Sequence, residues 1–145
     1  GKAIAAGSLN NNIHILYSAT VNNLSIEAHK RPVRGVAWNL DSTQLASVSD
    51  DRTLRIWDAT TGKAVQVLRG HVGFIKCVSW SRDGKRLASG SSMGEIVVWN
   101  AATGKVLHVM KEKGLIQCMA WSPDSTRLAT GGSEKNVKLW AFPDK

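Results

Sequence analysis

The stretch LASVSDDRTLRIWD, residues 45–58, decides the fold of this chain. Two related stretches follow it, LASGSSMGEIVVWN at 87–100 and LATGGSEKNVKLWA at 128–141, so the first residues of the three copies are 42 and 41 positions apart. All six tryptophans keep this spacing, in the two series Trp38, Trp80, Trp121 and Trp57, Trp99, Trp140. A fixed period in the low forties indicates a repeat architecture, in which each repeat is one small structural unit.

Within each repeat the local pattern is that of β-strands. The large side chains of Val36 and Trp38 alternate with the small ones of Gly35 and Ala37, and a period of two places them on opposite faces of a sheet. The pair Asp83-Gly84 has the residues that a tight hairpin turn requires. No segment of ten or more residues shows a helical pattern, and the sequence predicts an all-β fold.

The run Ala46 to Asp58, which ends in a Trp-Asp pair, resembles the closing half of a WD repeat. The dipeptide Gly70-His71 is similar to the Gly-His opening of that family. The resemblance covers nearly the whole chain and implies a β-propeller. Its blades would be four-stranded antiparallel sheets, usually seven of them, around a central channel with binding surfaces at the rims.

The repeat divides the chain into about three and a half blades. Residues 1–28 are expected to form a partial blade of three strands, 29–70 and 71–112 two complete WD-repeat blades, and 113–145 a partial blade without its outer strand. An open arc of this size leaves two sheet faces uncovered and is expected to expose aromatic surface. Closure is expected from blades of a longer parent chain or from a second copy. Whether the chain is a fragment, a natural oligomer or an engineered chain stays open at this point.

One blade contains residues that could be mistaken for a catalytic triad. The family resemblance implies instead that His29, Ser47, Asp51 and Trp57 form a buried hydrogen-bond network, which satisfies polar groups that cost ~1–3 kcal/mol each when buried unpaired. A serine in the middle of a strand also lacks the strained elbow and the oxyanion donors of a hydrolase. There is no glycine-rich phosphate loop either, and we expect no enzymatic activity.

The other repeats depart from this pattern. In the second complete blade the position of Asp51 is taken by Met93, and in the last blade the position of His29 is taken by Glu112. The first partial blade has Leu16 where the closing tryptophan belongs. Only the blade at 29–70 is therefore expected to form the complete network.

The resemblance also implies where a partner would bind. In WD-repeat proteins, partners usually meet the face that carries the loops before the first strand and after the second strand of each blade. The recurring side-chain positions there are occupied by Arg34, Lys76 and Gln117, by Leu9, Asp50, Ser92 and Ser133, and by Pro32, Phe74 and Leu115. Together with Lys30 and Arg31, the cations of this set suggest an acidic peptide or protein as the partner, with Phe74 as the best anchor.

Composition limits the remaining function classes. The formal net charge of +8 permits nucleic acid as an alternative partner, although paired exposed aromatics for stacking on bases are missing. Cys77 and Cys118 lack CxxC spacing, the four histidines form no HxxH or HxxxH group, and we expect neither a metal nor a cofactor. No apolar run approaches the ~18–20 residues that cross a bilayer, and no signal peptide is visible at the start. We expect an intracellular protein of a reducing compartment, cytoplasm or nucleus.

Overall fold

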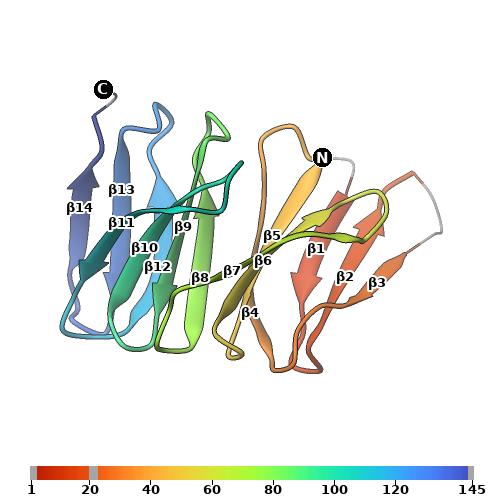
Figure 1. The fold of residues 1–145 in the computed structure, drawn as a ribbon, viewed down its shortest axis with the longest axis horizontal. Coiled ribbons are helices and arrows are strands. Elements are labelled where there is room, and N and C mark those ends of the chain that lie inside the picture. Colours follow the sequence, from red (N-terminus) through yellow and green to blue (C-terminus); the bar gives the residue numbers. More distant parts are fainter. Residues whose placement is uncertain (1–2, 20–22, 144–145) are drawn as a thin grey trace.

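The protein is a row of four antiparallel β-sheets that stand side by side (Figure 1). The structure, a computed structural model, describes residues 3–19 and 23–143. All regular structure in these residues is β-strand, which confirms the predicted all-β fold, and none of them lies in a helix that could cross a bilayer. Residues 1–2, 20–22 and 144–145, which belong to the predicted partial blades, lie outside the described residues.

The strands of each sheet follow one another in chain order, and each strand pairs antiparallel with the next. The first sheet contains β1 (Ala3–Gly7), β2 (Asn12–Tyr17) and β3 (Leu24–Glu27). The second sheet contains β4 (Val33–Trp38), β5 (Gln44–Ser49), β6 (Thr53–Asp58) and β7 (Ala64–Arg69). The third sheet contains β8 (Ile75–Trp80), β9 (Arg86–Ser91), β10 (Glu95–Asn100) and β11 (Val106–Lys111). The fourth sheet contains β12 (Ile116–Trp121), β13 (Arg127–Gly132) and β14 (Val137–Ala141).

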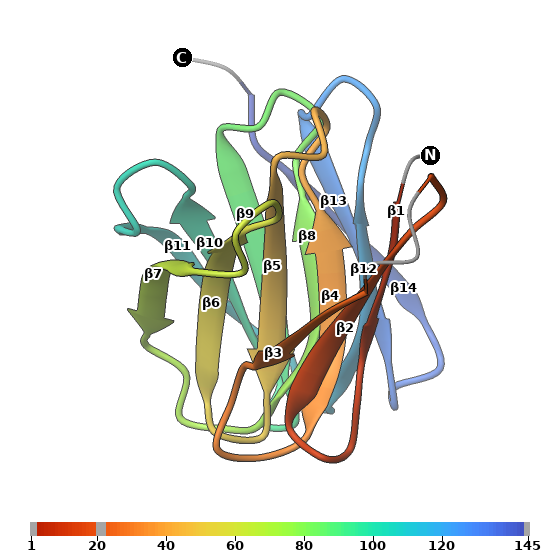
Figure 2. The same cartoon turned by 90° about the vertical axis from the view of Figure 1, so that its right-hand side faces the viewer.

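Strands β4, β8 and β12 form the inner edge of their sheets, and β8 contacts both β4 and β12, as the innermost strands of neighbouring propeller blades do. The connecting loops gather at the two ends of the sheets (Figures 1 and 2). We call one end the network rim; it consists of loops 8–11, 28–32, 50–52, 70–74, 92–94, 112–115 and 133–136. The opposite rim consists of turns 39–43, 59–63, 81–85, 101–105 and 122–126.

Three apolar clusters fill the spaces between neighbouring sheets. In each junction the first strand of one sheet inserts a branched side chain into the preceding sheet, and Ile116 of β12 does so against Gly90 of β9. A Cβ atom at position 90 would lie 2.5 Å from Cγ2 of Ile116, so only glycine allows this close approach. The alternation of large and small residues in the sequence thus lets a large side chain of one sheet pack against a small residue of the preceding sheet.

The outward face of the first sheet has no sheet packed against it among the described residues. Ile4 and Leu16 on that face are 70% and 47% exposed, whereas the residues one repeat later, Leu45 and Trp57, are 0% and 4% exposed. The same positions are therefore core when another sheet precedes them and surface when none does.

The outward face of the fourth sheet is uncovered as well. Val137 and Leu139 are 73% and 67% exposed, while the equivalent Ile96 and Val98 of the third sheet are fully buried. Cys118 is exposed on this face, whereas its equivalent Cys77 is buried in the preceding junction. The expectation of exposed aromatic surface was wrong. The large residues of these two faces are aliphatic, because the tryptophans of the fourth sheet point into the junction with the third.

Candidate functional site

The blade at 29–70 contains a continuous chain of buried polar contacts at the network rim. Nδ1 of His29 lies 2.9 Å from the Oδ2 atom of Asp51, and Nε2 of His29 lies 2.7 Å from Oγ of Ser47. The Trp57 indole donates a hydrogen bond of 2.8 Å to the same Oγ. The structure thus brings together the four residues that the sequence singled out, and they tie a rim loop to strands β5 and β6.

Burial and hydrogen bonding set the charges in this network. Burial lowers the pKa of His29 below its usual value, although the hydrogen bond with Asp51 acts in the opposite direction. Burial acts to raise the pKa of Asp51, but hydrogen bonds from Thr53, the Lys30 backbone and His29 outweigh it and lower the pKa to about 2. A neutral imidazole therefore donates to a carboxylate. Ser47 is fully buried, with its hydroxyl engaged by both His29 and Trp57, which suits a structural role.

The second complete blade corrects the prediction that only the blade at 29–70 is fully linked. His71 and Ser89 contact each other at 2.7 Å, and Trp99 donates to Ser89 at 2.9 Å. The carboxylate is supplied by Glu95, whose Oε2 lies 3.4 Å from Nδ1 of His71 and also accepts the backbone N–H of Val72. Glu95 stands two residues after Met93, and its longer side chain reaches back to the position that Asp51 fills in the preceding blade.

The last blade has a shorter network with a different charge arrangement. Trp140 donates to Oγ1 of Thr130 at 3.0 Å, and Thr130 donates to the buried carboxylate of Glu112 at 2.8 Å. The ammonium group of Lys138 lies 3.3 Å from the same carboxylate. Glu134, at the position of Asp51, is exposed at the surface.

The predicted partner-binding residues form an ordered surface on the network rim. Three equivalent backbone hydrogen bonds join the loop before each first strand to the loop after each second strand. The donors and acceptors are Asp50 to Pro32 (3.2 Å), Ser92 to Phe74 (2.8 Å) and Ser133 to Leu115 (3.1 Å). These six residues therefore occur as adjacent pairs along the rim, and Gln117 is exposed beside the last pair. Leu9, on the first partial blade, is exposed too.

Asp50 joins the two complete blades at this rim. Its carboxylate accepts a hydrogen bond of 2.9 Å from Nε of Arg34 in its own blade and another of 2.9 Å from Nζ of Lys76 in the next blade. Burial acts to raise the pKa of Asp50, but these two cations prevail and lower it. Much of the positive charge that the sequence assigned to a partner at positions 34 and 76 is thus balanced within the chain.

A pocket of about 450 Å³ lies next to this bridge. Phe74, 37% exposed, forms its apolar wall, and the guanidinium carbon of Arg52 lies 6.0 Å from the centre of its ring. Arg52 is not among the partner-binding residues expected from the sequence. The sequence signal that could have found it is its position directly after the network aspartate. The structure places it in a turn, with a backbone φ of 65° and an exposed side chain. The pocket is lined by Lys30, Arg31, Asp50, Asp51, Arg52 and Phe74.

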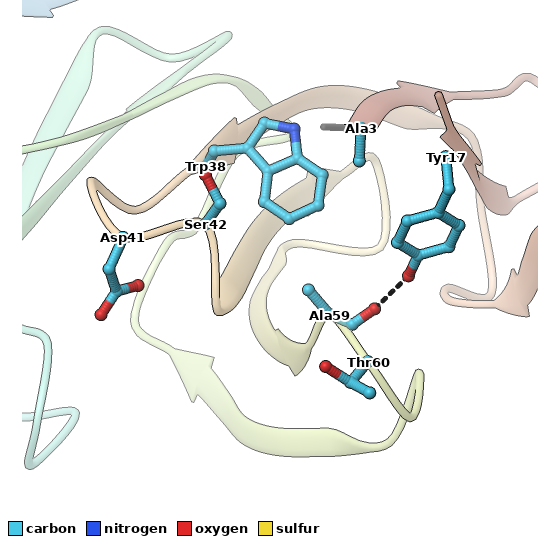
Figure 3. Close-up of a pocket in the computed structure, with 7 residues that line it drawn as sticks. All are labelled: Ala3, Tyr17, Trp38, Asp41, Ser42, Ala59 and Thr60. Carbon is cyan, nitrogen blue, oxygen red and sulfur yellow. Dashed lines mark hydrogen bonds between the residues drawn. The ribbon is translucent and has the colours of Figure 1, made fainter. Parts of the chain in front are cut away.

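A second pocket, of about 460 Å³, lies on the opposite rim between the first two sheets (Figure 3). The ring of Trp38 borders it, and the Tyr17 hydroxyl donates a hydrogen bond to the carbonyl of Ala59 at its edge. Its lining residues are Ala3, Tyr17, Trp38, Asp41, Ser42, Ala59 and Thr60. In the part of the chain that the structure describes, no group of three or more His, Cys, Asp or Glu residues could hold a metal ion.

Repeated four-stranded sheets with a Ser–Trp hydrogen bond at each complete blade define this chain as part of a WD-repeat β-propeller. The chain belongs to the family described as the WDR19 first β-propeller, whose family model matches residues 1–142.

Curated relatives are WD-repeat and other proteins that share part of this segment. Nuclear distribution protein PAC1 of Arthroderma benhamiae is 38% identical over 76 residues, which are 51% of this chain and 16% of the relative. WD repeat-containing protein SL1-17 of Schistosoma mansoni is 34% identical over 65 residues, 45% of this chain and 22% of the relative. Mitochondrial division protein 1 of Mycosarcoma maydis is 37% identical over 54 residues, 37% of this chain and 7% of the relative. The matched segment thus spans less than a quarter of each of these proteins.

Proposed function

We propose that this chain is a non-catalytic protein-interaction scaffold that binds an acidic peptide segment in the Phe74 pocket of the network rim. WD-repeat propellers generally bind other proteins, so a scaffold role follows from the family; the acidic partner and the pocket are our proposal. We also infer a reducing compartment, because Cys77 and Cys118 are both free thiols.

The distribution of charge around Phe74 carries this proposal. Lys30, Arg31 and Arg52 line the pocket, and among the described residues none of their side chains forms an ion pair with the pocket's carboxylates within 4.0 Å. Asp50 is engaged by two cations, and Asp51 accepts hydrogen bonds in the buried network with the guanidinium of Arg55 at 3.9 Å, so both carboxylates already have partners within the chain. A ligand with an apolar side chain flanked by carboxylates would satisfy both the ring and the three cations.

The test is a titration of the chain with a peptide of one tryptophan between glutamates, followed by fluorescence anisotropy of a dye on the peptide. We expect saturable binding that Arg52→Glu together with Lys30→Glu weakens by about tenfold, since two exposed ion pairs contribute ~0.2–1 kcal/mol each. The matched control is the double variant Lys63→Glu and Lys105→Glu on the opposite rim, which should leave the affinity unchanged. Equal weakening by both double variants would mean a general charge effect and would overturn the assignment of the pocket. A steep salt dependence with RNA and none with the peptide would favour the nucleic-acid alternative.

We further propose that a second copy of this chain covers both uncovered sheet faces. The outward face of the first sheet of each copy would pack on the outward face of the fourth sheet of the other. The face of the first sheet carries the large residues Ile4 and Leu16, and the face of the fourth carries Val137, Leu139 and Gly131. In every internal junction a large-residue face packs on the preceding sheet in this way. Around Gly131 only Cys118 and Asn136 of its own sheet lie within 4 Å of an added Cβ, which leaves room for an incoming side chain. The resulting contact is head to tail.

Molecular mass by light scattering tests this second proposal. We expect twice the mass of one chain, and a single-chain mass for both Leu16→Glu and Val137→Glu. A mixture of these two monomeric variants should recover a dimer, because one intact contact remains between a native first sheet and a native fourth sheet. Leu107→Glu, on the outer strand β11, is the control and should not dissociate the dimer. A single-chain mass for the unmodified chain rejects the second copy as the occupant of these faces.

A further inference from the structure

The third junction of the propeller contains an internal arginine that explains the pocket in Figure 3. The guanidinium carbon of Arg86 lies 5.1 Å from the centre of the Trp121 ring. One of its nitrogens donates a hydrogen bond of 2.7 Å to the backbone carbonyl of Ser125, and another lies 3.5 Å from the carbonyl of Phe142. The carboxylate of Asp83 lies 4.0 Å from the same guanidinium. The third junction therefore holds a guanidinium group against a tryptophan face, two backbone carbonyls and a carboxylate, and the chain itself supplies that group.

The first junction repeats the same frame two repeats earlier. Trp38 stands at the position of Trp121, Ser42 at that of Ser125 and Ala59 at that of Phe142. The backbones match, because Ser42 and Ser125 both have a φ of 61°. The N–H of Ala59 donates to Thr43 at 2.9 Å, as the N–H of Phe142 donates to Thr126 at 2.7 Å.

What differs is the residue that supplies the cation. Ala3 stands at the position of Arg86, and a methyl group fills almost none of the space that the arginine side chain occupies in the third junction. The result is the open pocket of about 460 Å³ beside the Trp38 ring (Figure 3). A pocket of this volume is within the range of small-molecule and side-chain binding sites.

From this comparison we infer that the Trp38 pocket binds a guanidinium group supplied from outside the chain. The flat cation stacks on the Trp38 ring, and its N–H groups donate to the carbonyls of Ser42 and Ala59, as those of Arg86 do in the third junction. The Ala59 carbonyl already accepts from Tyr17 and has a second lone pair for this contact. The Asp41 carboxylate lines the same pocket, and hydrogen bonds from Thr43 lower its pKa, so it adds a negative charge that favours a cation. This site is separate from the network rim and does not depend on the acidic-peptide proposal.

The experiment follows the indole N–H signals of the tryptophans by NMR while N-acetyl-arginine methylamide is added to the chain. We expect a saturable shift of the Trp38 signal. The uncharged N-acetyl-citrulline methylamide should produce none, and the lysine analogue should bind more weakly, because an ammonium group neither stacks as a plane nor offers a fork of donors. Methylguanidinium and the peptide Gly-Gly-Arg-Gly-Gly distinguish the source. Tighter binding of the peptide assigns the site to an arginine of a polypeptide, and equal binding assigns it to a small guanidinium compound.

Two variants test the comparison between the first and the third junction. Ala3→Arg should place its own guanidinium over Trp38 and abolish the response to the probe. Arg86→Ala should open the equivalent site and add a second saturable shift at Trp121, whose signal should not respond in the unmodified chain. Equal responses to arginine and citrulline, no shift of Trp38 up to the solubility limit of the probe, or a Trp121 that stays silent after Arg86→Ala would each overturn the inference.

Discussion

The Oε2 atom of Glu95 lies 3.4 Å from Nδ1 of His71, so a glutamate on strand β10 is the hydrogen-bond partner of a histidine that the sequence pattern leaves without an acidic partner. In the preceding blade the corresponding position holds Thr53, which donates a hydrogen bond of 2.6 Å to Oδ1 of Asp51. Both arrangements put a carboxylate beside the buried imidazole. The functional group is thus retained while the residue that supplies it moves along the chain by two positions.

The first prediction concerns this displaced carboxylate. Glu95→Ala should lower the free energy of unfolding by ~1–3 kcal/mol, because it leaves the buried ring of His71 and two backbone N–H groups with fewer partners. Met93→Ala should change it by less than about 0.5 kcal/mol, because that side chain is 53% exposed. Urea unfolding of both variants measures the difference. The double variant Glu95→Thr with Met93→Asp recreates the preceding blade and should regain most of the loss; equal costs for the two alanine variants would contradict the assignment.

The second prediction separates a structural serine from a catalytic one. Ser47→Ala removes the acceptor of the Trp57 indole and the partner of His29. We expect a loss of ~1–3 kcal/mol in the free energy of unfolding. Any ester hydrolysis measured with the unmodified chain should be unaltered by the substitution. Ser42→Ala, on an exposed turn, is the control for the stability measurement. Hydrolysis that vanishes in Ser47→Ala while stability is retained would reinstate the enzymatic interpretation.

The third prediction is a loss of stability on mild acidification. Burial lowers the pKa of His29 and of His71 from 6.5, so the unfolded chain takes up protons before the folded chain does. Their contribution to stability is complete above pH 6.5 and is lost as the pH falls below that value. Asp51, whose pKa falls from 3.8 to about 2, contributes fully above its usual pKa and loses its contribution as the pH approaches 2. Urea unfolding at pH 8 and pH 5.5 should show the first decrease, and His29→Gln with His71→Gln should reduce it. If the free energy of unfolding falls as much between pH 8 and pH 5.5 in that double variant as in the unmodified chain, other groups cause the pH dependence.

The fold could be predicted from the sequence because the residues that the packing of each blade requires recur at fixed positions of the repeat. Trp57 and Trp99 lie at fixed positions since each indole must reach the serine hydroxyl of its own blade. The site was less predictable. Glu95 satisfies His71 from a shifted position, which a comparison of equivalent positions does not detect. The ion pairs of Asp50 join two blades, so they depend on how the sheets stack, which no local pattern specifies. The Trp38 pocket lies between two sheets and has the small residue Ala3 in its lining, which carries no functional group that a sequence pattern could detect.

The fourth prediction uses the two thiols as reporters of the uncovered fourth sheet. Burial raises the pKa of Cys77 to about 12, so this thiol should resist alkylation, whereas Cys118 is exposed and should react first. Labelling with iodoacetamide followed by peptide mass spectrometry gives the two rates. If a second copy covers this face, the labelling of Cys118 should slow as the protein concentration rises and stay fast in Leu16→Glu. Rates for Cys118 that do not depend on concentration in either protein would argue against this cover.

The last prediction concerns Asp50, which holds Arg34 and Lys76 together across two blades. Asp50→Asn keeps the size of the side chain and removes the charge that balances those cations. The network rim then becomes more positive, and we expect the affinity for the glutamate-rich peptide to rise by a few-fold at low salt, with most of the gain lost at high salt because exposed charges are screened. Calorimetric titration at two salt concentrations measures this. The same substitution on the opposite rim, Asp124→Asn, adds the same net charge and should leave the affinity unchanged. If Asp50→Asn weakens binding instead, the carboxylate acts by holding the two cations in place, and their geometry matters more than their net charge.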